Sequence, residues 1–173
     1  LVRFFRAELN PFSHKVIALD INDFAPGLYF ADKHYVTEKD FGNPAEYIKS
    51  IIRICLEENV SHILTLVDPE LLLFAENRAL FMKNGITPIL SADEVIRNTF
   101  DKYSFFETYR NIVSVLETCK TKEEAVEAVK SGRLELPVMA KPRCGSGSAG
   151  LTVLHYLNEF DTLKYNSSNN YIF

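Results

Sequence analysis

The stretch from Leu136 to Leu154, LPVMAKPRCGSGSAGLTVL, decides how the second half of this 173-residue chain is expected to fold. An apolar run carries Lys141, stops at Pro142, passes through small residues and resumes as a second apolar run. We call the small-residue segment 145–150 the flap; it holds three of the chain's seven glycines. Two strand-forming runs joined by such a segment predict an antiparallel strand–loop–strand unit.

The flap glycines, Gly145, Gly147 and Gly150, match the pattern G-x-G-x-x-G, which is weak by itself. A dinucleotide site would need a helix to begin at the flap, but the LTVLHY that follows is strand-like. A Walker A loop is excluded because its lysine closes the loop, whereas Lys141 precedes the flap. Two interpretations stay open: a flap whose backbone amides face phosphate oxygens, and a mobile hairpin without a ligand.

Two lysines strengthen the first interpretation. Lys141 lies where an apolar strand leaves the core, and an ammonium there is costly to desolvate unless an anion or a carboxylate faces it. The alternative is that its side chain extends to the surface. Lys102, in FDKYSFFETY, is by itself typical of a surface charge. Its place at the start of a helix that enters the second half favours an anion site shared with Lys141.

Composition limits the possible partners. The chain is 47% hydrophobic with a formal net charge of −4, and its apolar runs are far shorter than the roughly 20 residues of a membrane-spanning helix. We expect a cytoplasmic globular protein that binds neither nucleic acid nor membrane, since it has no basic field. Cys55, Cys119 and Cys144 are widely spaced and odd in number, which favours free thiols. The oligomeric state stays open, with a homodimer as one option.

Strands alternate with helices in residues 1–98, which predicts a doubly wound, mainly parallel α/β domain. The run KVIALDI is expected to form a buried strand, and SHILTLV and ITPILS are expected to form two further strands. Asn43 and Pro44 open one helix, and Asp68 and Pro69 open another that is expected to end at Gly85. Because the chain begins in a helical pattern, we expect a first strand to precede Leu1.

Residues 99–173 are expected to form a second, α+β unit. A helix begins near Lys102, and Thr121 caps a helix that Gly132 ends. The strand–flap–strand segment follows, then a polar turn at 165–170 and the start of a strand in NNYIF. The order of these elements indicates an incomplete unit.

These segments resemble a known enzyme superfamily. FDKYSFFETY and LPVMAKPRCGSGSAGLTVL resemble the first half of the ATP-grasp domain, including its lysines and its glycine/serine flap. VIALDINDFAPGLYFADKHYV and ILTLVDPELLLFAENRALF are similar to the Rossmann-like pre-ATP-grasp domain of carbamoyl-phosphate-synthase-like proteins. The resemblance covers nearly the whole chain.

The resemblance implies an ATP-dependent ligase that activates a carboxylate as an acylphosphate for attack by an amine or a similar nucleophile. It places Lys102 and Lys141 on the ATP phosphates, and Met139 beside the adenine. Ser146, Gly147 and Ser148 would close over the β and γ phosphates, and Arg143 would either pair with phosphate or only solvate the loop. The Mg²⁺ ligands are expected beyond Phe173, so the chain alone is expected to be inactive.

The roles of several other residues stay open between a functional and a structural interpretation. Asp68 and Glu70 follow a strand, where substrates often bind in open α/β sheets, but helix capping explains them equally well. Cys144 beside the flap has no neighbouring base in the sequence that would activate it as a nucleophile. A non-catalytic nucleotide-sensing or interaction module on the same scaffold is the second hypothesis for function. An NAD-dependent oxidoreductase would need a glycine turn before Leu1.

Overall fold

The structure of this chain is a computed structural model that describes residues 1–38, 41–163 and 171–173; the polar turn expected at 165–170 lies outside them. Two compact units are present: Leu1–Ile63 with Ala79–Pro88, and Leu64–Arg78 with Ile89–Phe173. This division differs from the boundary expected after residue 98. Helix α5 (Asp93–Phe100) packs against both α3 (Asp68–Glu76) and α6 (Lys102–Tyr109), which joins these three helices into the second unit.

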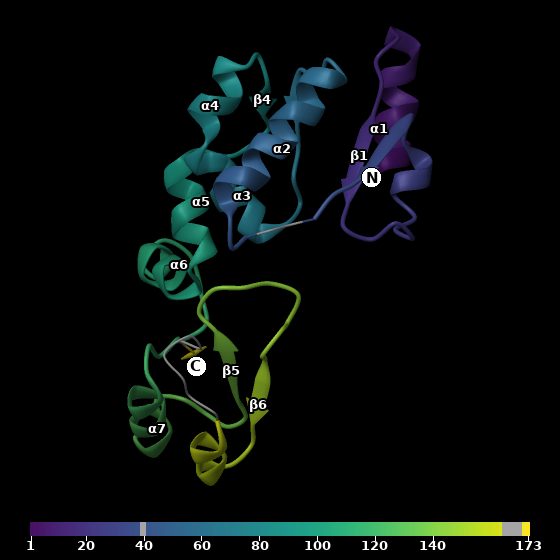
Figure 1. Cartoon of the computed structure of the whole chain (residues 1–173). Coiled ribbons are helices and arrows are strands. Elements are labelled where there is room, and N and C mark those ends of the chain that lie inside the picture. The colour runs from purple at the N-terminus through teal and green to yellow at the C-terminus, as the bar shows by residue number, and fades with distance from the viewer. Residues whose placement is uncertain (39–40, 164–170) are drawn as a thin grey trace. The chain divides into compact units, whose positions relative to one another are not determined.

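The first unit combines short helices with two pairs of strands (Figure 1). Its strands are β1 (Ile17–Asp20), β2 (Lys33–Val36), β3 (His62–Ile63) and β4 (Thr87–Pro88). Its helical segments are α1 (Val2–Leu9), η1 (Asn10–Phe12), η2 (Leu28–Phe30), α2 (Pro44–Glu57) and all but the first residue of α4 (Arg78–Lys83).

The paired strands of this unit run parallel. β1 pairs with β2 from Ile17 opposite Lys33 to Asp20 opposite Val36, and β3 pairs with β4. Parallel pairing needs crossover connections, so the predicted α/β class is confirmed. The hydrogen bonds form two separate two-stranded ladders, where the sequence pattern predicts one continuous sheet.

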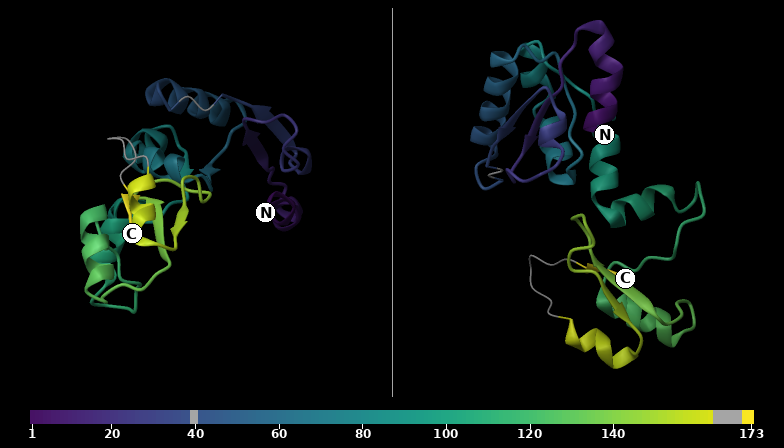
Figure 2. Two further views of the ribbon diagram at one scale, coloured as in Figure 1. Left: turned by 90° about the horizontal axis from the view of Figure 1, so that it is seen from below. Right: turned by 90° about the vertical axis from the view of Figure 1, so that its right-hand side faces the viewer.

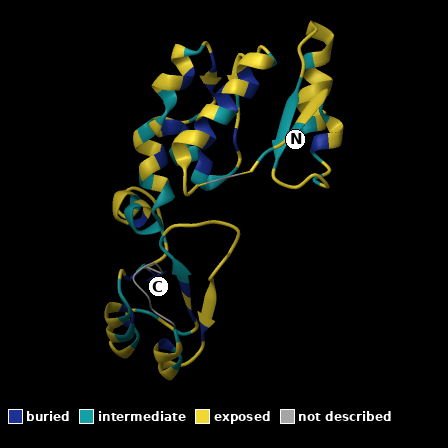
Figure 3. Cartoon of the chain, viewed as in Figure 1, coloured by how far each residue is buried: buried dark blue, intermediate teal, exposed yellow. Residues whose placement is uncertain are grey.

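Helix α2 supplies much of the buried surface of the first unit. Asn43 caps it, since its side-chain oxygen accepts a 3.4 Å hydrogen bond from the Glu46 amide, and Pro44 takes the first position, where no amide donor is needed. Figure 3 contrasts α2, whose buried residues lie along one face, with α1, in which no residue is buried. The buried residues of α2 are Tyr47, Ile48, Ile51, Ile52, Ile54 and Cys55.

The prediction of a single helix from Asp68 to Gly85 is wrong. The structure ends α3 at Glu76 and begins α4 at Arg78. At Asn77 the side-chain amide donates a 2.9 Å hydrogen bond to the Leu73 carbonyl oxygen, which also accepts the Asn77 backbone amide at 3.2 Å. An asparagine that bonds back to the preceding turn competes with continuation of the helix.

The second unit joins α3, α5 and α6 to a three-stranded antiparallel sheet. The sheet consists of β5 (Val138–Pro142), β6 (Thr152–Leu154) and β7 (Tyr171–Ile172) in the order β6-β5-β7. Helix α7 (Lys122–Lys130) and the 3-10 helix η3 (Leu157–Thr162) lie beside this sheet (Figure 2). The predicted strand–loop–strand arrangement is therefore confirmed: β5 and β6 pair antiparallel on either side of the flap.

One face of this sheet packs against the core and the other is open. Val138 and Ala140 are buried, whereas Met139 between them is exposed, as the two-residue alternation of a strand requires. The buried cluster at the packed face comprises Cys119, Ala125, Ala128, Val138, Ala140, Leu154, Phe160, Tyr171 and Phe173.

Thr121 caps α7. Its side-chain oxygen accepts a 3.2 Å hydrogen bond from the Glu124 amide, which fixes the start of the helix.

Candidate functional site

The ammonium of Lys102 is bonded to the chain where β5 passes into the flap. Its Nζ donates to the carbonyl oxygens of Pro142 at 3.0 Å, Arg143 at 3.4 Å and Gly145 at 2.8 Å. Its backbone amide also donates to the Arg143 carbonyl at 3.0 Å. An ammonium has three donors, so these carbonyls occupy all of them in this conformation. We call residues 142–145, where β5 passes into the flap, the foot of the flap.

Arg143 is paired with a carboxylate in this structure. Its Nε lies 2.7 Å and 2.6 Å from the two carboxylate oxygens of Asp101. Its guanidinium also lies over the ring of Tyr103, 5.5 Å from the centroid. Burial by itself raises the pKa of Asp101, but hydrogen bonds from Arg143 and from the Ser104 and Tyr103 amides outweigh it and hold the pKa below its usual range.

Asp101 is the residue that sequence reasoning missed. Its Oδ1 accepts hydrogen bonds from the amides of Tyr103 at 2.9 Å and Ser104 at 3.1 Å, so it caps α6. An aspartate directly before a helical pattern is a readable capping signal. Its pairing with Arg143, 42 residues away, has no local signal in the sequence.

The flap is exposed and has a backbone conformation suited to glycine. Positive φ angles occur at Gly145 (118°), Gly147 (65°), Ser148 (58°) and Gly150 (75°). The amides of Ser146, Gly147 and Ser148 donate no hydrogen bond to any residue of the described ranges. Successive unbonded amides in such a turn can face an anion.

The open face of the sheet carries Met139 and Lys141, which are two residues apart on β5. Val153 lies opposite Met139 in the β5–β6 pair and so shares this face. The side chains of Met139 and Val153 are 48% and 41% exposed. Within residues 1–38, 41–163 and 171–173, the Lys141 ammonium forms no hydrogen bond or ion pair. This face therefore offers apolar surface beside an unpaired cation.

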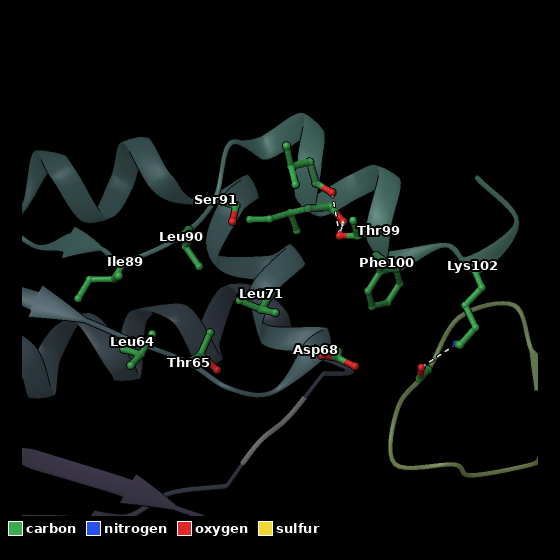
Figure 4. Close-up of a pocket in the computed structure, with 13 residues that line it drawn as sticks. Leu64, Thr65, Asp68, Leu71, Ile89, Leu90, Ser91, Thr99, Phe100 and Lys102 are labelled. Carbon is green, nitrogen blue, oxygen red and sulfur yellow. Dashed lines mark hydrogen bonds between the residues drawn. The ribbon is translucent and has the colours of Figure 1, made fainter. Parts of the chain in front are cut away.

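A cavity of about 430 Å³ lies within the second unit (Figure 4). Its residues 64–65 and 89–91 follow β3 and β4 in the chain, and Lys102 and Gly145 bring the foot of the flap to its lining. In Figure 4 the Lys102 side chain points to the loop that carries Gly145. The walls are mainly apolar and include Leu64, Leu71, Leu90, Ile96 and Phe100.

Asp68 and Glu70 have different surroundings. Asp68 lines the cavity, and Val67 takes the capping position of α3 without a side-chain cap, so capping does not account for the Asp68 carboxylate. Glu70 is 6% exposed, accepts a hydrogen bond from the Thr65 hydroxyl and is not part of the cavity lining. Of these two candidates, only Asp68 is placed where it could meet a ligand in the cavity.

Among the described residues, the other reactive groups form no further site. Burial is the main cause that raises the pKa of the Cys144 thiol, and Asp101 adds to it, so this cysteine favours its unreactive protonated form. In the part of the chain that the structure describes, no group of three or more His, Cys, Asp or Glu side chains could hold a metal ion. The same residues contain no helix that is long and apolar enough to cross a membrane.

Solved structures share this fold. The biotin carboxylase domain of the Hydrogenobacter thermophilus 2-oxoglutarate carboxylase, a dimer in complex with MgADP, ADP and bicarbonate, matches 93% of the chain with a TM-score of 0.65 and 21% identity. N5-carboxyaminoimidazole ribonucleotide synthetase from Thermus thermophilus matches 99% with a TM-score of 0.63 and 15% identity. N5-carboxyaminoimidazole synthetase from Staphylococcus aureus matches 98% with a TM-score of 0.66 and 15% identity.

The chain spans 36%, 43% and 42% of the length of those three proteins. A search of curated sequences returned no significant match. The chain thus shares the fold of these three proteins over nearly its whole length. The chain belongs to the family described as PylC-like, N-terminal domain, whose model matches residues 1–89.

Proposed function

We propose that this chain supplies the flap-bearing half of an ATP site in an ATP-grasp ligase that joins a carboxylate to an amine or a similar nucleophile. The single observation that carries the proposal is the Lys141 ammonium on the open face of β5, directly before the foot of an exposed flap. Among the described residues, neither this ammonium nor the amides of Ser146, Gly147 and Ser148 have a hydrogen-bond partner. A cation beside free backbone donors is an arrangement that stabilises phosphate oxygens.

The residues present fit a nucleotide. The amides of Ser146, Gly147 and Ser148 would face the β and γ phosphates, and Lys141 would balance their charge. Met139 and Val153 offer apolar surface against which a purine can pack, since both are substantially exposed on the same sheet face. Lys102 would reach phosphate by exchanging its bond to the Gly145 carbonyl for one to a phosphate oxygen.

The described part of the chain does not offer a set of ligands that fits Mg²⁺. Mg²⁺ takes oxygen ligands, chiefly carboxylates, and no group of three or more His, Cys, Asp or Glu side chains among those residues could hold a metal ion. The expectation that the Mg²⁺ ligands lie beyond Phe173 stays a prediction.

ATP would supply the phosphoryl group that turns a substrate carboxylate into an acylphosphate. No enzyme nucleophile is needed for this chemistry, so the contribution of the chain is to position the phosphates and to neutralise charge. The cavity that contains Asp68 is the proposed place of a small-molecule substrate, because it is mainly apolar with a few convergent polar groups.

The test is an ATP titration of the intact protein by calorimetry. Lys141→Ala should weaken ATP binding by about tenfold or more, since it removes a charge-assisted bond to phosphate. Lys130→Ala is the matched control, because Lys130 is an exposed lysine in the last turn of α7. Equal ATP affinity of the two variants would refute the assignment of Lys141.

A second measurement separates the ligase from the nucleotide-sensing module. Hydroxylamine captures acylphosphates as hydroxamates, so a full-length ligase that contains this chain, incubated with ATP and a panel of carboxylates, should yield a hydroxamate with at least one of them. ATP binding without hydroxamate or ADP formation from any carboxylate would favour the module.

A further inference from the structure

Two contacts fix the foot of the flap to the start of α6. One is the Asp101–Arg143 ion pair, and the other is the set of bonds from Lys102 to the carbonyls of residues 142, 143 and 145. Asp101 and Lys102 are adjacent in the chain, so both contacts come from the N-terminus of α6. The foot is therefore bound to a helix although the flap beyond it is exposed.

The Asp101–Arg143 ion pair is less exposed than the other ion pair of α6. The Arg143 and Asp101 side chains are 23% and 22% exposed, whereas those of Arg110 and Glu107 on α6 are 49% and 42% exposed. A partly desolvated pair with two short contacts is screened less by water than an exposed one. The Tyr103 ring beneath the guanidinium restricts it further.

The far end of the flap is also constrained. A Cβ on Gly150 would lie 2.9 Å from the Pro142 Cγ, so the return of the flap lies directly against the residue that begins the foot. The residue against which Gly150 lies is thus the one whose carbonyl oxygen accepts a bond from Lys102 at the other end of the flap.

We propose that Asp101 and Arg143 are positioning residues: their ion pair holds the foot of the flap on α6 and thereby sets where the flap amides and the Lys102 ammonium meet phosphate. Arg143 then acts through Asp101 and does not bind phosphate itself. The effect on phosphate binding rests on the proposed function, but the attachment of the foot to α6 can be tested without nucleotide.

The first experiment measures hydrogen exchange of the Lys102 amide by NMR in the absence of nucleotide. This amide donates to the Arg143 carbonyl, so it reports whether the foot is attached. Arg143→Gln and Asp101→Asn should each accelerate its exchange by about fivefold or more. Asparagine still caps a helix, so Asp101→Asn removes the ion pair and retains the cap. Arg143→Lys, which keeps a cation, should restore part of the protection.

Arg110→Gln is the matched control, because Arg110 also pairs with a carboxylate on α6 and lies over an aromatic ring, 5.7 Å from the Phe106 centroid. It should leave Lys102 exchange unchanged. In the double variant of Asp101 and Arg143, exchange should be no faster than in either single variant, because the two residues act as one unit. Multiplied effects in the double variant, or unchanged exchange in the single variants, would overturn the proposal.

The second experiment measures the ATP affinity of the same variants of the intact protein. Positioning predicts that Arg143→Gln and Asp101→Asn weaken binding by the same factor. A direct contact between Arg143 and phosphate predicts the opposite for Asp101→Asn, since freeing the guanidinium would preserve or tighten binding; that result would overturn the positioning role. If no form binds ATP, the proposed function fails while the exchange data still decide whether the foot is attached.

Discussion

The ammonium of Lys102 donates a 2.8 Å hydrogen bond to the carbonyl oxygen of Gly145, 43 residues later in the chain. This bond joins the N-terminus of α6 to the first glycine of the flap, and two further carbonyls, of Pro142 and Arg143, accept from the same ammonium. A residue expected to meet ATP thus also has a structural role in the folded chain.

Replacing Lys102 should therefore reduce stability as well as ATP affinity. Lys102→Met removes the donor and leaves three carbonyls to water, so the free energy of unfolding should fall by about 1–2 kcal/mol. Urea unfolding monitored by circular dichroism measures the change. Lys130→Met is the control and should fall within about 0.5 kcal/mol of the parent. A Lys102→Met variant as stable as this control would contradict the structural role.

Gly150 should tolerate alanine less well than Gly132. Both have a φ of 75°, so alanine is strained at either position, by about 1–2 kcal/mol. At Gly132 an added Cβ meets nothing within 4 Å, whereas at Gly150 it lies 2.9 Å from the Pro142 Cγ and 3.4 Å from the Tyr171 hydroxyl. The difference in unfolding free energy between Gly150→Ala and Gly132→Ala isolates that contact. Equal losses would show that the flap moves away from Pro142 at little cost.

The cap of α7 gives a prediction independent of any ligand. Thr121→Ala removes the oxygen that accepts the Glu124 amide and should lower the free energy of unfolding by about 1 kcal/mol. Thr121→Ser keeps that oxygen and should retain most of the stability. If serine and alanine were equally destabilising, the loss would come from packing of the threonine methyl group instead of the cap.

The Asp101–Arg143 pair should make the stability of the fold depend on pH in the acid range. Although burial alone would raise the pKa of Asp101, its bonds from Arg143 and the helix amides hold its folded-state pKa below the ordinary value of 3.8. A depressed carboxylate pKa stabilises the folded state above the unfolded pKa, and this contribution is lost as the pH falls through the folded pKa. The melting temperature of the parent should therefore exceed that of Asp101→Asn near neutral pH, and the difference should shrink below about pH 4.

The check is a series of thermal melts from neutral pH into the acid range, with Glu107→Gln as the control for an exposed carboxylate on the same helix. A difference between the parent and Asp101→Asn that stays constant with pH would show that the carboxylate charge does not stabilise the fold.

Local patterns predicted individual elements well. The Asn43–Pro44 start of α2, the Thr121 cap of α7 and the antiparallel pairing around the flap follow from side-chain chemistry within a few residues. Prediction failed where two local options compete: Asn77 fits a helix but also bonds back to Leu73, and the break between α3 and α4 results. Glu70 and Asp68 look alike in the sequence, but only the fold shows that one is buried against Thr65 and the other lines a cavity.

The amino-acid sequence by itself determined the strands, the capped helices and the glycine-rich conformation of the flap, because these depend on backbone preferences and on contacts between near neighbours. Only the tertiary structure decided which charges are free. It pairs Arg143 with Asp101, binds the Lys102 ammonium to three carbonyls, and leaves Lys141 without a partner among the residues it describes. The physical reason is that an ion pair or a hydrogen bond depends on distance in space, and residues about forty positions apart come together only when the chain has folded.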